Sequence, residues 1–293
     1  MAPRFHDSPG DSCSPCPRPP PGRRRLVVNA DDFGRSDSIN EAVIRAHHEG
    51  ILTSASLMVD EPACAEAVRL AKGSPRLGVG LHLTLACGRA ALGPDAIPGL
   101  VNRQGRFPDS PARAGLRYFF RRELKAQLRA EILAQFEKFR ATGLPLDHVN
   151  GHLHLHLHPT VLGILMEEAE ALGLKRLRLT RDPLGLNLRL ASGRLGYRLA
   201  HALLFGGLAA WARPALAKRG IRHTQSVFGL LQNGRVDEDY LCRLLPRLPA
   251  GDSELYSHPA LPECKPEFDA LVSPRVRERV SRLGIQLVRY QDL

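Results

Sequence analysis

The sequence predicts an α/β protein that folds as a single-domain (β/α) barrel. Its 293 residues are 43% apolar and 24% charged, which is enough chain to bury a large core. Short apolar or β-branched runs alternate with stretches whose apolar residues recur at helical spacing. Two smaller domains or a doubly wound open sheet remain alternatives, because such patterns do not show whether a sheet closes.

The predicted strands and helices alternate along the chain. Strands are expected at residues 26–30, 52–58, 77–83, 146–151, 176–180, 223–228, 254–257 and 286–289. Helices are expected at 38–49, 62–72, 121–141 and 159–172, with Pro62 and Pro159 in first turns that tolerate proline. In such barrels the active site lies at the carboxyl ends of the strands, so reactive side chains are expected there.

Residues 1–24 are expected to form a disordered tail ahead of a domain at 25–293. The tail is rich in proline, polar and without periodicity, so it buries too little apolar surface to offset the entropy of ordering. Cys13 and Cys16 form a CxxC pair there, but no second pair completes a zinc site. The six scattered cysteines fit reduced thiols better than disulfides.

The charge of the chain predicts attraction to an anionic partner. The formal net charge is +11 and the pI is about 9.8. Only 5% of residues are aromatic and no nucleic-acid-binding motif accompanies the charge, so we expect no nucleic-acid partner. Without an apolar leader or a long apolar run, the sequence favours a cytoplasmic protein.

One basic stretch, residues 188–219, allows a peripheral role at the inner face of the membrane. Its centre, 200–212, is largely apolar. The basic residues that flank it are Arg189, Arg194, Arg198, Arg213, Lys218 and Arg219. Such a segment could lie on a membrane surface or cover a lipid-bearing substrate. The alternative is an ordinary buried helix of the barrel.

Two motifs at predicted strand ends carry candidate metal ligands. In NADDFG (29–34), Asp31 and Asp32 would repel each other unless a cation or a shared proton relieved them. In GLHLT (80–84), His82 could bind a metal as a neutral imidazole. Each motif alone has a plainer interpretation, a helix cap or solvated turn for the acids and a satisfied core residue for the histidine.

A third motif is the histidine-rich tract DHVNGHLHLHLHP at 147–159. If its first part is extended, alternation places His148, His152, His154 and His156 on one face. Same-face neighbours lie about 6.5 Å apart along a strand, so one of them is expected to bind the metal and the others to line or support the pocket. The alternative is a tract that arose by chance.

An aspartate and two histidines from three strands would form a facial site with open positions for water and substrate. Both hydrolases and iron oxygenases use such sites, and the spacing in the sequence does not separate them.

Together with SHPA (257–260), these motifs resemble the YdjC-like carbohydrate deacetylases, also called chitooligosaccharide deacetylases, over nearly all of residues 25–293. The segments INEAVIRAHHEGILTSASLMV (39–59) and AGLRYFF (114–120) are most similar to the subgroup associated with hopanoid lipid biosynthesis. The resemblance implies a deformed (β/α) barrel. It also implies a metal-dependent hydrolase that removes the N-acetyl group from an N-acetylglucosamine-type sugar, with a hopanoid glycolipid as one candidate substrate.

The resemblance also implies the roles of individual residues. Asp32, His82 and His152 would hold a divalent ion, Mg²⁺ or Zn²⁺. Asp31 would be the base, and His258 the acid that protonates the departing amine. A plainer interpretation of His258 is a histidine hydrogen-bonded to the backbone. Some relatives carry an aspartate where this chain has Asn150, which puts a charge relay there in doubt.

Further substrate contacts are expected from His154, His156, Arg178 and Arg181. The two arginines end a predicted strand and could orient a sugar or phosphate oxygen, although a solvated charge run is the alternative. The expected partner is an acetylated amino sugar or glycolipid, and a homodimer is left open. The rival functions are a metal-dependent hydrolase of another ester or amide and a catalytically silent carbohydrate- or lipid-binding barrel.

Overall fold

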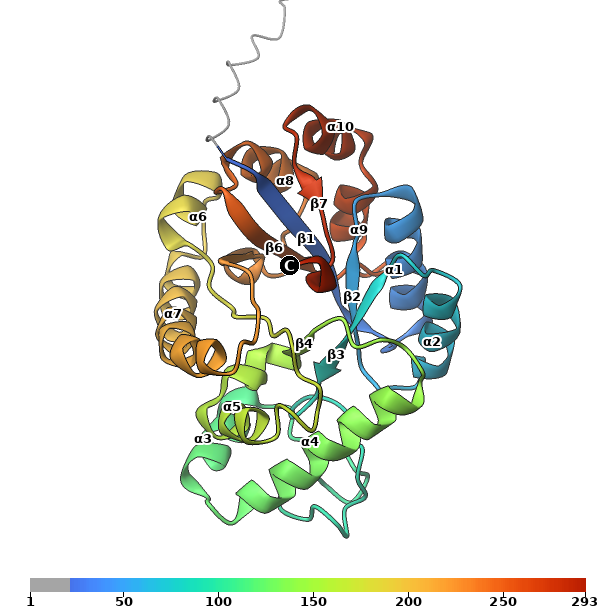
Figure 1. Ribbon diagram of the computed structural model, residues 1–293, viewed down its shortest axis with the longest axis vertical. Helices are drawn as coiled ribbons and strands as arrows, with labels where there is room; N and C mark the ends of the chain where they lie inside the picture. Colours follow the sequence, from blue (N-terminus) through green and yellow to red (C-terminus); the bar gives the residue numbers. More distant parts are fainter. Residues whose placement is uncertain (1–21) are drawn as a thin grey trace, which may run out of the picture.

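A parallel β-sheet that curls into an incomplete barrel forms the centre of the molecule (Figure 1). The computed structural model describes residues 22–293. Its strands are β1 (Arg24–Phe33), β2 (Ser54–Leu57), β3 (Gly78–Leu83), β4 (Val149–Gly151), β5 (Ser226–Phe228), β6 (Gly251–Ser257) and β7 (Gln286–Leu287). Their order is β4-β3-β2-β1-β6-β5, with β7 paired to β1. The predicted α/β class and deformed barrel are confirmed, whereas almost all of the predicted tail and its CxxC pair lie outside the described residues.

The predicted strand at residues 176–180 is wrong as a strand. Leu177 pairs with Val149 of β4, and Arg176 pairs with Arg222 ahead of β5, each as an isolated bridge. Because the segment meets each neighbour through one residue pair, it does not extend into a ladder. It nevertheless spans the gap between β4 and β5, so the barrel closes through single bridges rather than through a continuous strand.

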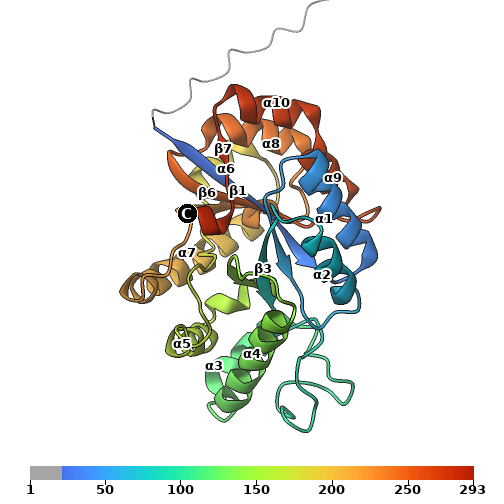
Figure 2. The same cartoon turned by 45° about the vertical axis from the view of Figure 1, so that its right-hand side comes forward.

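Helices surround this sheet (Figures 1 and 2). They are α1 (Asp37–Glu49), α2 (Cys64–Lys72), α3 (Pro111–Phe120), α4 (Leu124–Ala141), α5 (Pro159–Glu167), α6 (Leu184–Leu190), α7 (Leu195–Lys218), α8 (Glu238–Leu244), α9 (Lys265–Val272) and α10 (Pro274–Arg282). Local sequence explains where two of these helices begin. The Ser36 side chain accepts a hydrogen bond from the Ile39 amide at the start of α1, and Pro159 is the first residue of α5. The four predicted helices are confirmed with shifted ends.

The central strands are almost entirely buried, polar residues included, because helices cover the outside of the sheet. Nine of the ten residues of β1 are buried, and all residues of β2, β3 and β4 are buried. Since neighbouring strands are parallel, the carboxyl ends of β1, β3, β4 and β6 reach the same end of the barrel. The four described cysteines, from Cys64 to Cys264, are free thiols, as predicted.

Candidate metal centre

The adjacent aspartates stand where β1 ends in an unusual turn. Asp32 has a φ of 64° and Gly34 a φ of 91°, a left-handed conformation that is costly for a residue with a side chain such as Asp32. A side chain at Gly34 would also lie 3.0 Å from the Leu57 side chain. At this turn Asp31 and Asp32 bond to different partners although they are adjacent in sequence.

Asp32, His82 and His152 converge from three strand ends, and their donor atoms lie within 4.8 Å of one another. Asp32 Oδ1 is 3.2 Å from His82 Nε2 and 3.0 Å from His152 Nδ1, and the two nitrogens are 3.3 Å apart. This oxygen is buried without a hydrogen-bond donor among the described residues. An unpaired carboxylate oxygen that faces two imidazole nitrogens fits a divalent ion.

The side chain of Asn150 fixes the tautomer and the ring orientation of His82. The Asn150 amide group donates to Asp31 Oδ1 (3.1 Å) and Ser56 Oγ (2.8 Å), which leaves Asn150 Oδ1 to accept from His82 Nδ1 (2.7 Å). His82 therefore carries its proton on Nδ1 and turns the lone pair of Nε2 toward Asp32. This arrangement orients a metal-binding histidine.

Asp31 is an ionised carboxylate in a buried ion pair. Arg178 donates to it through two nitrogens, at 2.7 and 2.9 Å, and Asn29 Nδ2 adds a bond of 2.8 Å to Oδ1. Burial by itself raises the pKa of Asp31, but the surrounding cationic groups, Arg178 foremost, together hold that pKa well below its usual range. Asp31 Oδ2 accepts only from Arg178 within the described chain, so it keeps a free lone pair.

The expectation that Arg178 orients a sugar is wrong. Its side chain has no exposed surface, and it also donates to Glu254 Oε1 at 3.0 and 2.7 Å. Its guanidinium lies over the ring of Tyr256, 4.5 Å from the centroid. Arg178 thus positions Asp31 from inside the barrel and does not line the cavity beside the candidate metal site.

The histidine tract is not an extended strand beyond residue 151, which corrects the predicted alternation. Residues His152–Leu157 form a 3₁₀ segment, η1, in which Leu153 and His154 have positive φ. His152 lies beside Asp32 and His82 in the candidate metal site, whereas His156 is fully buried and bonds the Arg178 carbonyl (2.9 Å). The predicted contact of His156 with substrate is therefore wrong.

Burial lowers the pKa of His156 to about 3, so this ring is neutral at pH 7. His148 belongs to the core as well, where it bonds Asp147 (3.0 Å) and Ser56 (2.9 Å) and stacks on Tyr290. The histidines of the tract are regularly spaced in sequence, but their side chains lie in different surroundings.

A cavity of about 560 Å³ adjoins the metal ligands. Asp31, His82 and His152 line it, and so do His154 and His258. His154 bonds the Tyr256 hydroxyl (3.0 Å), and burial, followed by the charge of Arg178, keeps its pKa well below its usual range. Most of the remaining wall is apolar, and α7 and η1 contribute six of its residues: Leu153, Leu155, Tyr197, Leu204, Phe205 and Leu208.

The structure brings His258 to the cavity but not Arg181. The His258 ring meets the Tyr256 ring edge-on, at 5.7 Å between centroids, while its backbone amide donates to Glu267 Oε2 (2.6 Å). His258 directly follows β6, and its side chain lines the same cavity as Asp31. Arg181 is exposed and does not line the cavity, so its predicted contact with substrate finds no support there.

Sequence reasoning missed Ser56, Tyr256 and the cavity face of α7. Ser56 could have been noticed as a polar residue inside a short buried strand. Tyr256 lies in β6, two residues before His258 at the strand end, and both side chains line the cavity. No comparable signal marks Tyr197 or Phe205, because an apolar helix face predicts core packing equally well.

With fold and site in place, comparison with known proteins identifies the family. Residues 25–282 match the model of the YdjC-like protein family, and the chain therefore belongs to that family. A solved structure from Enterococcus faecalis V583, named for cellobiose-phosphate cleavage, superposes with a TM-score of 0.71 at 22% identity, covering 92% of this chain and 99% of that one. This likeness shows the shared fold alone.

Curated relatives carry the name carbohydrate deacetylase. The chain is 42% identical to the protein from Brevibacillus brevis over 146 residues and 40% identical to that from Geobacillus stearothermophilus over 148 residues. Each match covers 50% of this chain and 56% of the relative. The chain thus spans about half the length of the curated relatives that it matches.

Proposed function

We propose that this protein is a metal-dependent hydrolase that removes the N-acetyl group from an N-acetylglucosamine-type sugar. One observation carries the proposal: the unpaired Oδ1 of Asp32 faces His82 and His152 beside a cavity that can admit a sugar. The relatives named carbohydrate deacetylase support the same reaction.

The donor set favours a metal of the zinc type over magnesium. Two imidazoles and one carboxylate suit zinc and related transition ions, whereas Mg²⁺ prefers an all-oxygen octahedron. When bound, such an ion would polarise an acetyl carbonyl and lower the pKa of a water molecule. Asp32, His82 and His152 would be its three protein ligands.

Asp31 would accept a proton and His258 would donate one at different stages of the reaction. Asp31 is kept ionised by Arg178, and its Oδ2 has a lone pair to accept a proton from water. His258, on the cavity wall, would protonate the departing amine. His154 lines the same cavity and would contact the sugar.

We also propose four further properties that the sequence suggested. The protein would belong to the hopanoid-associated subgroup, act on a glycolipid, be located in the cytoplasm and form a homodimer. A metal-dependent hydrolase of another ester or amide remains the rival enzyme, and a silent binding barrel the rival from another class. The Asp31–Arg178 pair beside the ligand cluster favours an enzyme over a silent barrel.

Release of acetate decides among these functions. Purified protein is incubated with N-acetylated chitooligosaccharides, with and without a chelator, and acetate is assayed. We expect release that the chelator abolishes and added zinc restores. Hydrolysis of simple esters in preference to the N-acetyl sugars would favour the rival enzyme. If metal-loaded protein binds the sugars but releases no acetate, the silent barrel is correct.

A further inference from the structure

The exposed large apolar side chains of residues 22–293 are gathered on one flank. They are Leu116, Phe119, Phe120, Leu153, Leu188, Leu195, Leu199, Leu203, Leu204 and Trp211, and all belong to α3, η1, α6 or α7. Figures 1 and 2 both place α3 and α7 on the same side of the molecule, with α5 between them. Isolated exposed leucines are ordinary, but a gathering of this kind marks a binding surface.

Helix α7 shows the feature most clearly. Phe205, Ala209, Ala212 and Leu216 form its buried face, so the helix lies against the barrel. Its length and hydropathy would suffice to cross a bilayer, yet only 22% of its most apolar window is buried. A helix face turned to water normally carries charge, whereas the outer face of α7 is apolar from Leu195 to Trp211.

Helices α3, α6 and α7, which carry all but one of these exposed apolar side chains, contain basic residues and no acidic residue. No aspartate or glutamate occurs between residues 183 and 236, or between 110 and 122. The basic residues of these stretches include Arg113, Arg117, Arg121, Arg122, Arg189, Arg194, Arg213, Lys218 and Arg219. Apolar side chains surrounded by arginines fit the acyl boundary and anionic headgroups of a bilayer. A second copy of this chain would instead bring like charges together.

The flank also surrounds the opening of the cavity. Pro111 and Ala112 of α3, Leu153 of η1 and Leu204 of α7 are exposed and also line the cavity beside the metal ligands. We propose that α3, η1 and α7 form a docking surface for an anionic lipid bilayer, which places the cavity opening at headgroup level. The sequence had suggested residues 188–219 alone, and the structure adds α3 and η1.

The single tryptophan of the chain, Trp211, reports on this surface directly. Full-length protein is mixed at low salt with vesicles of equimolar phosphatidylglycerol and phosphatidylcholine, with or without brominated acyl chains. We expect Trp211 emission to shift to the blue and to be quenched by the brominated lipid, and added salt to weaken binding. Phe120→Ser and Leu203→Ser should each lower the vesicle partition coefficient about tenfold.

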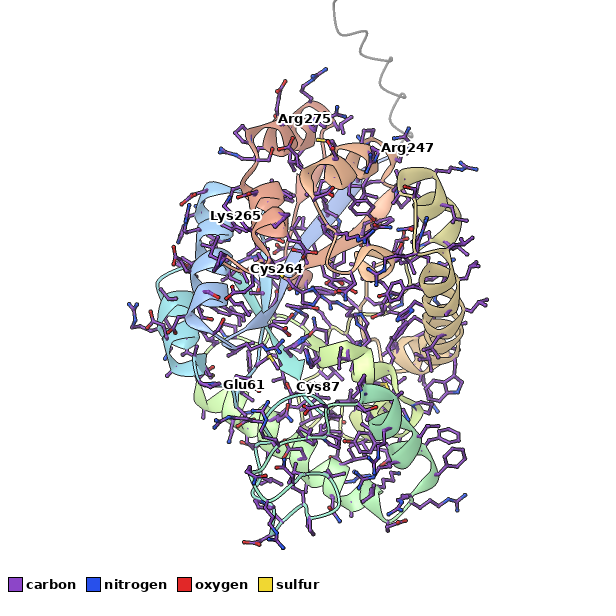
Figure 3. The ribbon with its side chains drawn as sticks, turned by 180° about the vertical axis from the view of Figure 1, so that it is seen from behind. Glu61, Cys87, Arg247, Cys264, Lys265 and Arg275 are labelled. Carbon is purple, nitrogen blue, oxygen red and sulfur yellow. The ribbon has the colours of Figure 1, made fainter. Side chains whose placement is uncertain are left out.

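A matched pair of arginine substitutions shows whether vesicle binding depends on where the positive charge lies. Arg213→Gln on α7 should weaken vesicle binding, whereas Arg275→Gln removes the same charge from α10, at the far end of the molecule from α3 (Figure 3), and should not. Phe120→Ser and Leu203→Ser should leave acetate release from a water-soluble substrate unchanged, because neither residue lines the cavity.

Two results would overturn the docking surface: Trp211 emission that ignores vesicles at low salt, or a blue shift that depends on protein concentration in the absence of lipid. The second result would assign the flank to contact between copies of the chain. Vesicle binding is measured without turnover, so a protein that binds lipid but releases no acetate would refute the proposed function and leave the docking surface intact.

Discussion

Beneath the metal ligands, a chain of buried hydrogen bonds ties the site to the core. Asp147 accepts from His148, and His148 in turn bonds Ser56 (2.9 Å). Ser56 accepts from the amide groups of Asn29 (2.9 Å) and Asn150 (2.8 Å). Both amides also donate to Asp31, so their orientation is fixed from below. Such buried networks make the geometry of a site rigid.

Asn150→Ala should weaken metal binding without unfolding the protein. The substitution removes the acceptor that keeps the His82 proton on Nδ1, so the ring no longer presents Nε2 in a fixed orientation. Loss of such a support costs about 10–100-fold in metal affinity. Competition with a zinc chelator measures the change, with Asn102→Ala in a surface turn as the control. An unchanged dissociation constant would remove Asn150 from this role.

Asp31→Asn should keep the metal and lose most turnover. The amide cannot accept a proton from water, and general-base catalysis contributes about 10²–10⁴-fold to rate. Metal content and kcat are measured together, with folding checked by circular dichroism because Arg178 loses its charged partner. If kcat stays near that of the wild type, the base is another group.

At the scale of elements, the periodic parts of the sequence were predictable and the irregular parts were not. Strands β1, β2 and β3 and the helices α1, α2 and α4 follow from apolar spacing, with a capping serine at the start of α1. The conformation of the tract after β4 could not be predicted in this way. Its alternation of histidine and leucine is typical of a strand, whereas Leu153 and His154 adopt positive φ. The three residues that the family resemblance implied as metal ligands do converge in the structure, although the spacing of the tract alone did not single out His152.

Arg178 illustrates why burial has to be seen in the structure. A basic residue near a strand end was expected to face the substrate, but its charge is compensated inside the barrel by Asp31 and Glu254. Both carboxylates come from distant strands, so no local pattern reveals the pairing. The same holds for Tyr290, whose hydroxyl donates to Glu254.

Arg178→Met should destabilise the fold strongly. It leaves Asp31 and Glu254 as uncompensated buried charges, which costs about 3–5 kcal/mol. Urea unfolding measures the loss, and Arg181→Met is a matched control three residues away because Arg181 is exposed. The control should change stability by less than about 0.5 kcal/mol. Equal effects of the two substitutions would contradict the assigned roles.

At the scale of the whole molecule, one buried acid makes stability depend on pH. Asp182 accepts from the Leu231 amide (3.0 Å) in the core, and burial raises its pKa to about 7. Because the folded state holds this proton more tightly than the unfolded chain, the contribution of Asp182 to stability is greatest below about pH 4 and declines up to about pH 7.

Asp182→Asn should therefore flatten the stability profile between about pH 4 and pH 7, where a single such group changes stability by up to about 1.4 kcal/mol per pH unit. Urea unfolding at several pH values measures it. Asp269→Asn, at an exposed position on α9, serves as the control and should retain the wild-type slope. A slope that Asp182→Asn leaves unchanged would place the titration elsewhere.

The central claim is that one divalent ion, held by Asp32, His82 and His152, drives removal of an acetyl group. It is tested most directly by adding zinc stepwise to metal-free protein and recording acetate release from an N-acetylated chitooligosaccharide. We predict that the rate rises from the background, saturates at one ion per chain and stays at the background in His152→Ala, which lacks one ligand. Full acetate release by the metal-free protein, or an unchanged titration in His152→Ala, would contradict the claim.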